Sequence, residues 1–226
     1  MSEWWTYSLS SFLLFSPRTY YRLFELYNVA IWPLQIVAFG LGLTILLVWL
    51  RGGAWAGRVA AAILAACWLW VAWAYLFVRY DTINWAARYF AVGFVVEALL
   101  LIWAGLVRDR FRLSTADAIG KAGIALFVFA LVVQPLIGPL TGRPWVQAEL
   151  FGIAPDPTVV ATIGILVAAR RLLWMPLIIP LLWCAISSAT LWTMESPDAL
   201  VMPTAGVLAV VLMARKSASR SPLRLG

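Results

Sequence analysis

The sequence predicts an all-α, polytopic membrane protein with seven transmembrane helices, its N-terminus outside and its C-terminus inside. Three observations predict this fold class: an apolar composition, seven separate apolar stretches, and basic residues concentrated on alternate connections. Hydrophobic residues make up 64% of the 226 residues and charged residues only 12%. Soluble domains are about half apolar and about a quarter charged. We therefore expect the chain to contact the lipid bilayer over most of its surface.

The seven apolar stretches differ mainly in length. In order along the chain they are Val29–Leu50, Val59–Val78, Phe90–Val107, Ile119–Leu140, Thr158–Ala169, Leu172–Trp192 and Leu200–Ala214. The first would form a helix of about 33 Å, enough for a hydrocarbon core of about 30 Å. The fifth and seventh are short enough to be re-entrant instead of spanning. Backbone polar groups cannot stay unpaired in lipid, so each stretch is predicted to be helical.

Basic residues predict which ends of these helices face the cytoplasm. With the N-terminus outside, the outer connections are 1–28, 79–89, 141–157 and 193–199, and they hold 5 of the 17 Lys and Arg residues. The other 12 lie on the inner side. An excess of Lys and Arg in short cytoplasmic loops is typical of membrane proteins. The net charge of +7 is thus a topology signal, and we expect no nucleic-acid partner.

The pattern divides the chain into an outer interfacial segment (1–28), the transmembrane domain (29–214) and a basic cytoplasmic tail (215–226). In the first segment, Ser16 is predicted to cap an amphipathic helix that starts at Pro17. Tyr20, Phe24 and Tyr27 share one face of this helix. The segment is either an anchor at the membrane surface or a lid over an outward-facing cavity. The tail either contacts anionic headgroups or is only a solubilising end.

Residue types that carry common enzyme chemistry are missing from the sequence. There is no histidine, which excludes His-ligated haem, His-containing zinc sites and Ser-His dyads. No Gly-rich phosphate loop, GxSxG or CxxC motif is found. Cys67 and Cys184 lie inside predicted spans and are interpreted as packing residues. We therefore predict no enzyme activity, no cofactor and no metal site.

Glu97 is the most informative polar residue, because it falls near the middle of the third apolar stretch. An ionised carboxylate at that depth costs a few kcal/mol or more, so the group should be protonated, paired or in a wet cavity. It is a candidate proton- or cation-coupling acid. The alternative is a protonated carboxyl group that hydrogen-bonds a neighbouring helix, worth about 1 kcal/mol.

The other candidate binding residues are predicted near the outer face: Gln134, Glu149, Asp156 and Arg79. Gln134 is followed by Pro135 and Pro139, and proline leaves backbone carbonyls without donors. Asp156-Pro157-Thr158 most simply caps the fifth helix, with Asp156 as the cap. Alternatively, Asp156 stands at the end of a broken helix that faces a substrate, as in many transporters. Arg79, with Asp81 and Arg88, could belong to a polar outer vestibule.

Two segments carry a family resemblance. The opening MSEWWTYSLSSFLLFSPRTYYRLFELYN and the later ELFGIAPDPT resemble a family of bacterial integral membrane proteins classed as a domain of unknown function. The resemblance extends over the whole chain. It implies a location in the bacterial inner membrane, and it implies no mechanism.

Two hypotheses for function follow. In the first, the protein transports a small solute or cation, with Glu97 as the coupling carboxylate and the Gln134–Asp156 region as the outer gate. In the second, it is a non-catalytic membrane subunit, an assembly factor or a sensor partner, and its small and aromatic residues pack against another membrane protein.

Overall fold

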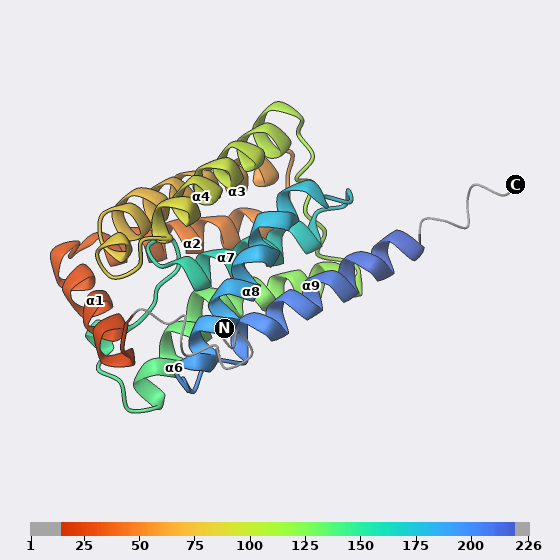
Figure 1. Ribbon diagram of the computed structural model, residues 1–226. Helices are drawn as coiled ribbons and strands as arrows, with labels where there is room; N and C mark the ends of the chain where they lie inside the picture. Colours follow the sequence, from red (N-terminus) through yellow and green to blue (C-terminus); the bar gives the residue numbers. More distant parts are fainter. Residues whose placement is uncertain (1–14, 220–226) are drawn as a thin grey trace, which may run out of the picture.

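A bundle of helices lying roughly side by side makes up the computed structural model, which describes residues 15–219 (Figure 1). No strand occurs in this range, so the predicted all-α class is confirmed. The α-helices are α1 (Pro17–Ala30), α2 (Leu34–Arg51), α3 (Ala56–Trp70), α4 (Ala87–Leu101), α5 (Ala118–Val128), α6 (Gln134–Leu140), α7 (Pro155–Ala168), α8 (Ile178–Thr193) and α9 (Val201–Ala218).

Three of these helices continue as wider π-helical turns, at Val71–Phe77 after α3, Ile102–Val107 after α4 and Phe129–Val133 between α5 and α6. Short 3-10 turns occur at Tyr80–Thr82, Trp145–Gln147 and Met175–Leu177. The third π-helical segment ends just before Pro135, whose ring nitrogen has no hydrogen to donate to the preceding turn. Together, α5, this π-helical segment and α6 form one continuous helix from residue 118 to residue 140.

Six helices among the described residues are long and apolar enough to cross a membrane. They are 34–51, 56–82, 87–107, 118–140, 175–193 and 201–218. The seventh predicted stretch, Leu200–Ala214, is thus part of a full-length helix, α9. The fifth, Thr158–Ala169, forms α7, whose 14 residues span about 21 Å. Alone it is shorter than a hydrocarbon core of about 30 Å.

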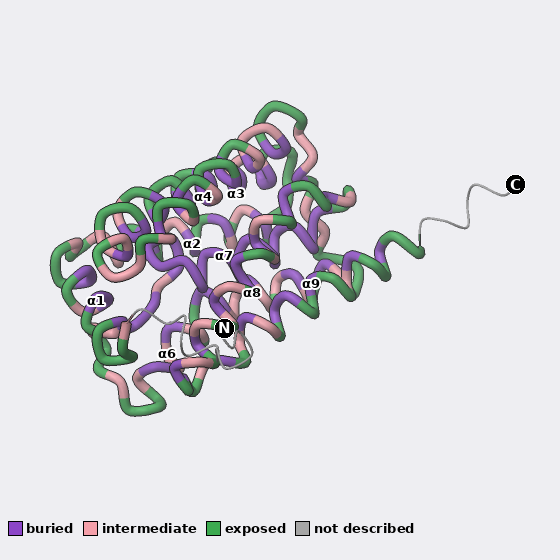
Figure 2. Tube along the Cα trace, in the orientation of Figure 1, coloured by how far each residue is buried: buried purple, intermediate pink, exposed green. Residues whose placement is uncertain are grey.

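α7 lies inside the bundle, and all of its residues are buried (Figure 2). It packs against α3, α5, α8 and α9. The irregular segment that leads into it is buried as well, from Ala148 to Ala154 apart from Leu150. Non-helical backbone is tolerated at membrane depth only where protein or water surrounds it. An internal helix and its buried approach therefore form the centre of the fold.

Two glycines allow α7 to approach α5 closely. A Cβ atom built on Gly164 would lie 2.6 Å from the backbone oxygen of Gly123, and one built on Gly123 would lie 2.5 Å from that of Gly164. The two helices thus touch backbone to backbone, which is how small residues drive helix association in membranes.

Replacing Gly164 by alanine should destabilise the protein by about 3 kcal/mol, because the added methyl group meets backbone that cannot move away independently. Thermal unfolding of the purified protein in detergent measures the effect. Gly40→Ala is the matched control, since nothing lies within 4 Å of a Cβ at that exposed position of α2. Equal melting temperatures for the two variants would contradict this packing.

The connections gather at two opposite ends of the bundle, with α1 across the first of them (Figure 1). At this end the Phe15 ring contacts the Tyr80 ring, with centroids 5.7 Å apart, and the Tyr21 hydroxyl is hydrogen-bonded to that of Ser196. At the other end Arg58 pairs with Asp109. α7 begins at the first end and finishes at the second, where Lys216 donates from α9 to its last carbonyls.

α1 confirms the predicted start of the first helix. Ser16 is its N-cap and accepts a hydrogen bond from the Thr19 amide, and Pro17 is the first helical residue. The aromatic face of α1 is buried, and the Phe24 ring stacks on that of Tyr75 at 4.8 Å. Within the described residues, the aromatic face of α1 therefore packs against other parts of the protein. Residues 1–14 of the predicted interfacial segment and 220–226 of the basic tail lie outside the described residues.

Candidate functional site

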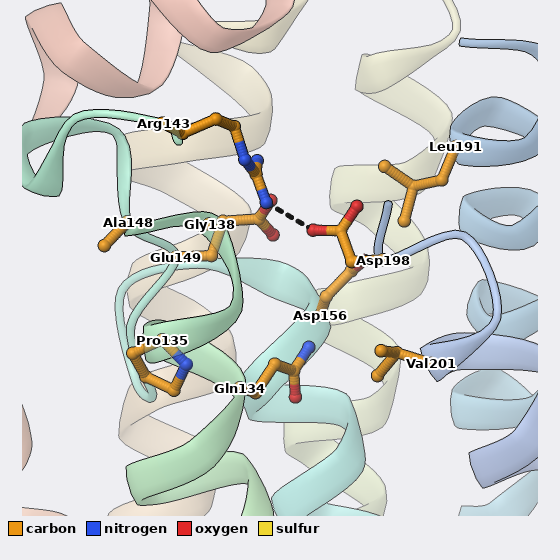
Figure 3. A pocket seen from close by; sticks show the side chains of 10 residues that line it. All are labelled: Gln134, Pro135, Gly138, Arg143, Ala148, Glu149, Asp156, Leu191, Asp198 and Val201. Atoms are coloured by element: carbon orange, nitrogen blue, oxygen red, sulfur yellow. Dashed lines mark hydrogen bonds and ion pairs between the residues drawn. The ribbon is translucent and has the colours of Figure 1, made fainter. Parts of the chain in front are cut away.

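A small cavity brings three carboxyl groups and one arginine together at the first end of the bundle (Figure 3). We call it the acidic cavity. It is lined by Gln134, Pro135, Gly138, Arg143, Ala148, Glu149, Asp156, Leu191, Asp198 and Val201. These residues come from α6, α7, α8, α9 and the connections between them. Three predicted candidates, Gln134, Glu149 and Asp156, thus meet at one place.

Asp156 lies in the first turn of α7 and is 3% exposed. Its carboxylate accepts hydrogen bonds from the Trp183 indole N–H at 2.7 Å and the Ser187 hydroxyl at 2.6 Å, both from α8. The predicted role as a helix cap is wrong, because the cap position is Ala154 and Pro155 is the first helical residue. The carboxylate is instead turned towards α8, and its place in the first turn of α7 puts it at the positive end of the α7 dipole, which also favours a negative charge.

Among the described residues, Arg143 is the only basic residue that lines the acidic cavity. Its Nη2 donates to Asp198 at 2.5 Å, and its guanidinium lies 4.3 Å from the centre of the Tyr21 ring. Gly138 makes room for it, since a Cβ there would lie 3.1 Å from the guanidinium carbon. The Nε and Nη1 atoms are buried without a hydrogen-bond partner among the described residues. Arg143 therefore faces three carboxyl groups and still has hydrogen-bond donors that are not used within residues 15–219.

Glu149 is 8% exposed, and within residues 15–219 its carboxyl group makes no hydrogen bond. Figure 3 shows it directed towards Arg143. Burial raises the pKa of Glu149 well above its usual range, and the negative charges of Asp156 and Asp198 raise the pKa further. The Arg143 guanidinium lowers it in part. Because desolvation dominates, Glu149 holds a proton at pH values at which an ordinary glutamate is ionised.

The size of the acidic cavity limits what it can hold. Its free space of about 10 Å³ for the centre of a water molecule corresponds to about one water. An organic solute does not fit this conformation. Within the part of the chain that the structure describes, no group of three or more Asp, Glu, Cys or His residues is arranged to hold a metal ion. A buried carboxyl group whose pKa is raised, such as that of Glu149, can bind and release a proton.

Gln134 lines the same cavity from the start of α6, and its side-chain oxygen is buried without a hydrogen-bond partner among residues 15–219. The residue directly follows the π-helical segment Phe129–Val133. Single π-helical turns occur frequently at functional sites. Gln134 thus adds an unsatisfied acceptor to a cavity that already contains unsatisfied donors.

Glu97 lies apart from the acidic cavity, in α4. It is 0% exposed, and neither carboxyl oxygen has a hydrogen-bond partner among the described residues. Phe94, one turn earlier on α4, packs edge-on against the Trp183 ring with centroids 5.0 Å apart. Trp183 in turn donates to Asp156. An aromatic contact therefore links the helix of the deep carboxyl group to the acidic cavity.

Arg79 does not line the acidic cavity. It follows the π-helical turn Val71–Phe77, and its backbone carbonyl accepts from the Thr82 hydroxyl. Of the predicted vestibule, only Asp81 and Arg88 pair with each other, at 2.9 Å on the surface.

Asp198, Trp183 and Ser187 were not among the sequence candidates, and Arg143 was included only as part of the Gln134–Asp156 region. Arg143 is the single basic residue of connection 141–157, and this feature could have identified it as a candidate binding residue. Trp183 and Ser187 are four residues apart in an apolar stretch, so they share a helix face and offer two donors. Asp198 gave no signal, because its partner lies 55 residues away in the chain.

Comparison with known proteins identifies a family and no activity. A model described as a family of unknown function, DUF6064, matches residues 18–222. No curated protein and no solved structure matches the chain significantly.

Proposed function

The chain belongs to the family of unknown function DUF6064, and we propose that it moves protons across the membrane, coupled to a small solute or ion. The acidic cavity is the outer proton site, and Glu97 is the coupling carboxyl group within the membrane. One observation carries the proposal: three carboxyl groups share a single arginine in a water-sized cavity at the end of an internal helix.

The charge balance of the acidic cavity supports a proton as the bound species. With all groups ionised, three negative charges would face one positive charge in a desolvated place. Like charges held close together cannot all stay ionised, so one carboxyl group keeps a proton. Glu149 is that group, because it lacks the donors that stabilise Asp156 and Asp198. A proton can therefore enter and leave at Glu149 while the ion pair holds the cavity together.

Glu97 supports the proposal because both of its carboxyl oxygens are buried without a hydrogen-bond partner among residues 15–219. Intramembrane acids are costly and commonly belong to proton or ion pathways. The proposed route passes from the acidic cavity, past the contact of Trp183 with Phe94, to Glu97. The aromatic rings would act as the barrier that separates the two protonation sites.

The proposed orientation follows the charge pattern. α7 carries the chain from the end with the acidic cavity to the end with Lys216, so it serves as a seventh crossing. The helix is short, and the buried segment that leads into it supplies the remaining length. The basic end then faces the cytoplasm, and the cavity faces the outside of a bacterial inner membrane. A short internal helix whose end faces a site is also how many transporters build their binding sites.

Proton flux into proteoliposomes tests the proposal. The full chain is reconstituted with a pH-sensitive dye inside, and a potassium gradient with valinomycin provides the driving voltage. We expect faster internal acidification than in empty vesicles, and a rate at least about tenfold lower in Glu149→Gln, because a proton-accepting group is removed.

Glu195→Gln is the matched control for this flux. Glu195 is an exposed acid at the same end and does not line the acidic cavity. Its substitution should leave the rate unchanged. Wild-type vesicles that acidify no faster than empty ones would contradict proton movement by the protein.

A further inference from the structure

A second cavity, at the opposite end of the bundle, has different chemistry. It has a volume of about 390 Å³ and lies between the end of α2 and the connections 108–117 and 169–174. Its lining includes Trp49, Phe111, Arg112, Thr115 and Arg170. We call it the basic cavity. Its volume is in the range of small-molecule sites, which is about 300–1,000 Å³.

The two arginines of the basic cavity are held next to each other by backbone. The Arg170 amide donates to the Arg112 carbonyl at 2.6 Å, beside the antiparallel bridge between Leu113 and Ala169. Within residues 15–219 neither guanidinium takes part in an ion pair. Asp109, the one acid in the lining, is already paired with Arg58 at 3.3 Å. The cavity therefore presents two uncompensated positive charges.

Large apolar side chains line part of the cavity, and exposed apolar side chains lie on the turns of α2 that precede it. Trp49 and Phe111 are fully buried, and Trp49 is fixed by a hydrogen bond to the Ser114 carbonyl at 3.3 Å. The exposed side chains of Leu43, Leu47 and Leu50 share one face of α2 and form an apolar track along it. Trp55 is also exposed at this end, as expected of an interfacial anchor.

We propose that the basic cavity binds the phosphate of an anionic phospholipid headgroup, with the acyl chains along α2. Two arginines that line one cavity suit phosphate, since each guanidinium group can donate two parallel hydrogen bonds. Basic pockets between membrane helices on the cytoplasmic side are a known way of holding anionic lipids. The apolar track on α2 favours a lipid over a soluble phosphate. This inference does not depend on proton movement.

A lipid titration tests the proposal. The melting temperature of the purified full chain is followed as phosphatidylglycerol is added in neutral mixed micelles, with phosphatidylcholine and inorganic phosphate in parallel. We expect phosphatidylglycerol alone to raise the melting temperature, because a ligand that binds only the folded state stabilises it. The lipid concentration at half-effect should rise at least about tenfold in R112Q/R170Q, which loses both guanidinium contacts.

The double variant R51Q/R171Q is the matched control. It removes two exposed arginines from the same end that do not line the cavity, so the half-effect concentration should stay as in the wild type. The single variant R112Q, whose side chain is exposed, gives the same test if the double variant does not fold. Three results would overturn the proposal: equal response to phosphatidylcholine, an equal effect of inorganic phosphate, or an equal weakening in both double variants.

Discussion

Replacing Arg143 by glutamine should destabilise the protein by about 3 kcal/mol, the lower end of the range for breaking a buried ion pair, because this pair is part-buried. The Arg143 side chain is 15% exposed and that of Asp198 13%, so little water is available to take over the pairing. The variant leaves the three carboxyl groups of the acidic cavity without a positive charge. Unfolding in detergent at neutral pH measures the loss.

Two comparisons separate this effect from a general effect of losing an arginine. Arg88→Gln breaks the exposed pair with Asp81 and should not change the melting temperature measurably. Adding Asp198→Asn to Arg143→Gln should recover part of the stability, because it removes one uncompensated buried charge. A loss in Arg143→Gln no larger than that in Arg88→Gln would mean that the ion pair does not hold the acidic cavity together.

Replacing Glu97 by leucine should make the protein more stable and abolish its proton flux. The carboxyl oxygens of Glu97 are buried and unpartnered among the described residues, and an unsatisfied buried polar group costs about 1–3 kcal/mol. Leucine removes that cost with little change in volume. Opposite effects on stability and activity are expected where a residue is kept for function.

Glu97→Gln distinguishes the charge of Glu97 from its shape. Glutamine keeps the size and polarity and cannot exchange a proton, so flux should be lost without the gain in stability. The two variants are compared in the proteoliposome assay and in thermal unfolding. If Glu97→Leu lowers the melting temperature, the carboxyl group has a structural partner and the coupling role is wrong.

The sequence predicted most of the helices because length and apolarity alone determine a membrane crossing. The predicted start at Ser16 and Pro17 is also confirmed, since capping is a local property. The position of α7 inside the bundle could not be predicted from the sequence. A helix that is apolar on every side has the same sequence pattern whether lipid or protein surrounds it. Its full burial becomes visible only when its neighbours are in place.

Only three of the residues that line the acidic cavity were sequence candidates, for a similar reason. Glu149 and Asp156 are near one another in the chain, and the charge pattern assigned both to the same side. The partners that define their chemistry come from distant segments: Asp198 is 55 residues from Arg143, and Ser187 is 31 residues from Asp156. Proline next to Asp156 indicated a helix start, and only packing against α8 shows that its carboxylate turns inward.

Infrared titration of the carboxyl groups tests the central claim, that the acidic cavity holds a proton, most directly. A protonated carboxyl group absorbs at a frequency distinct from that of a carboxylate. We predict that the wild type keeps a protonated-carboxyl band well above pH 4.3, the usual pKa of glutamate, because burial favours the neutral form. The component due to Glu149 should be missing in Glu149→Gln and present in Glu195→Gln. Identical spectra for wild type and Glu149→Gln across the titration would contradict the account.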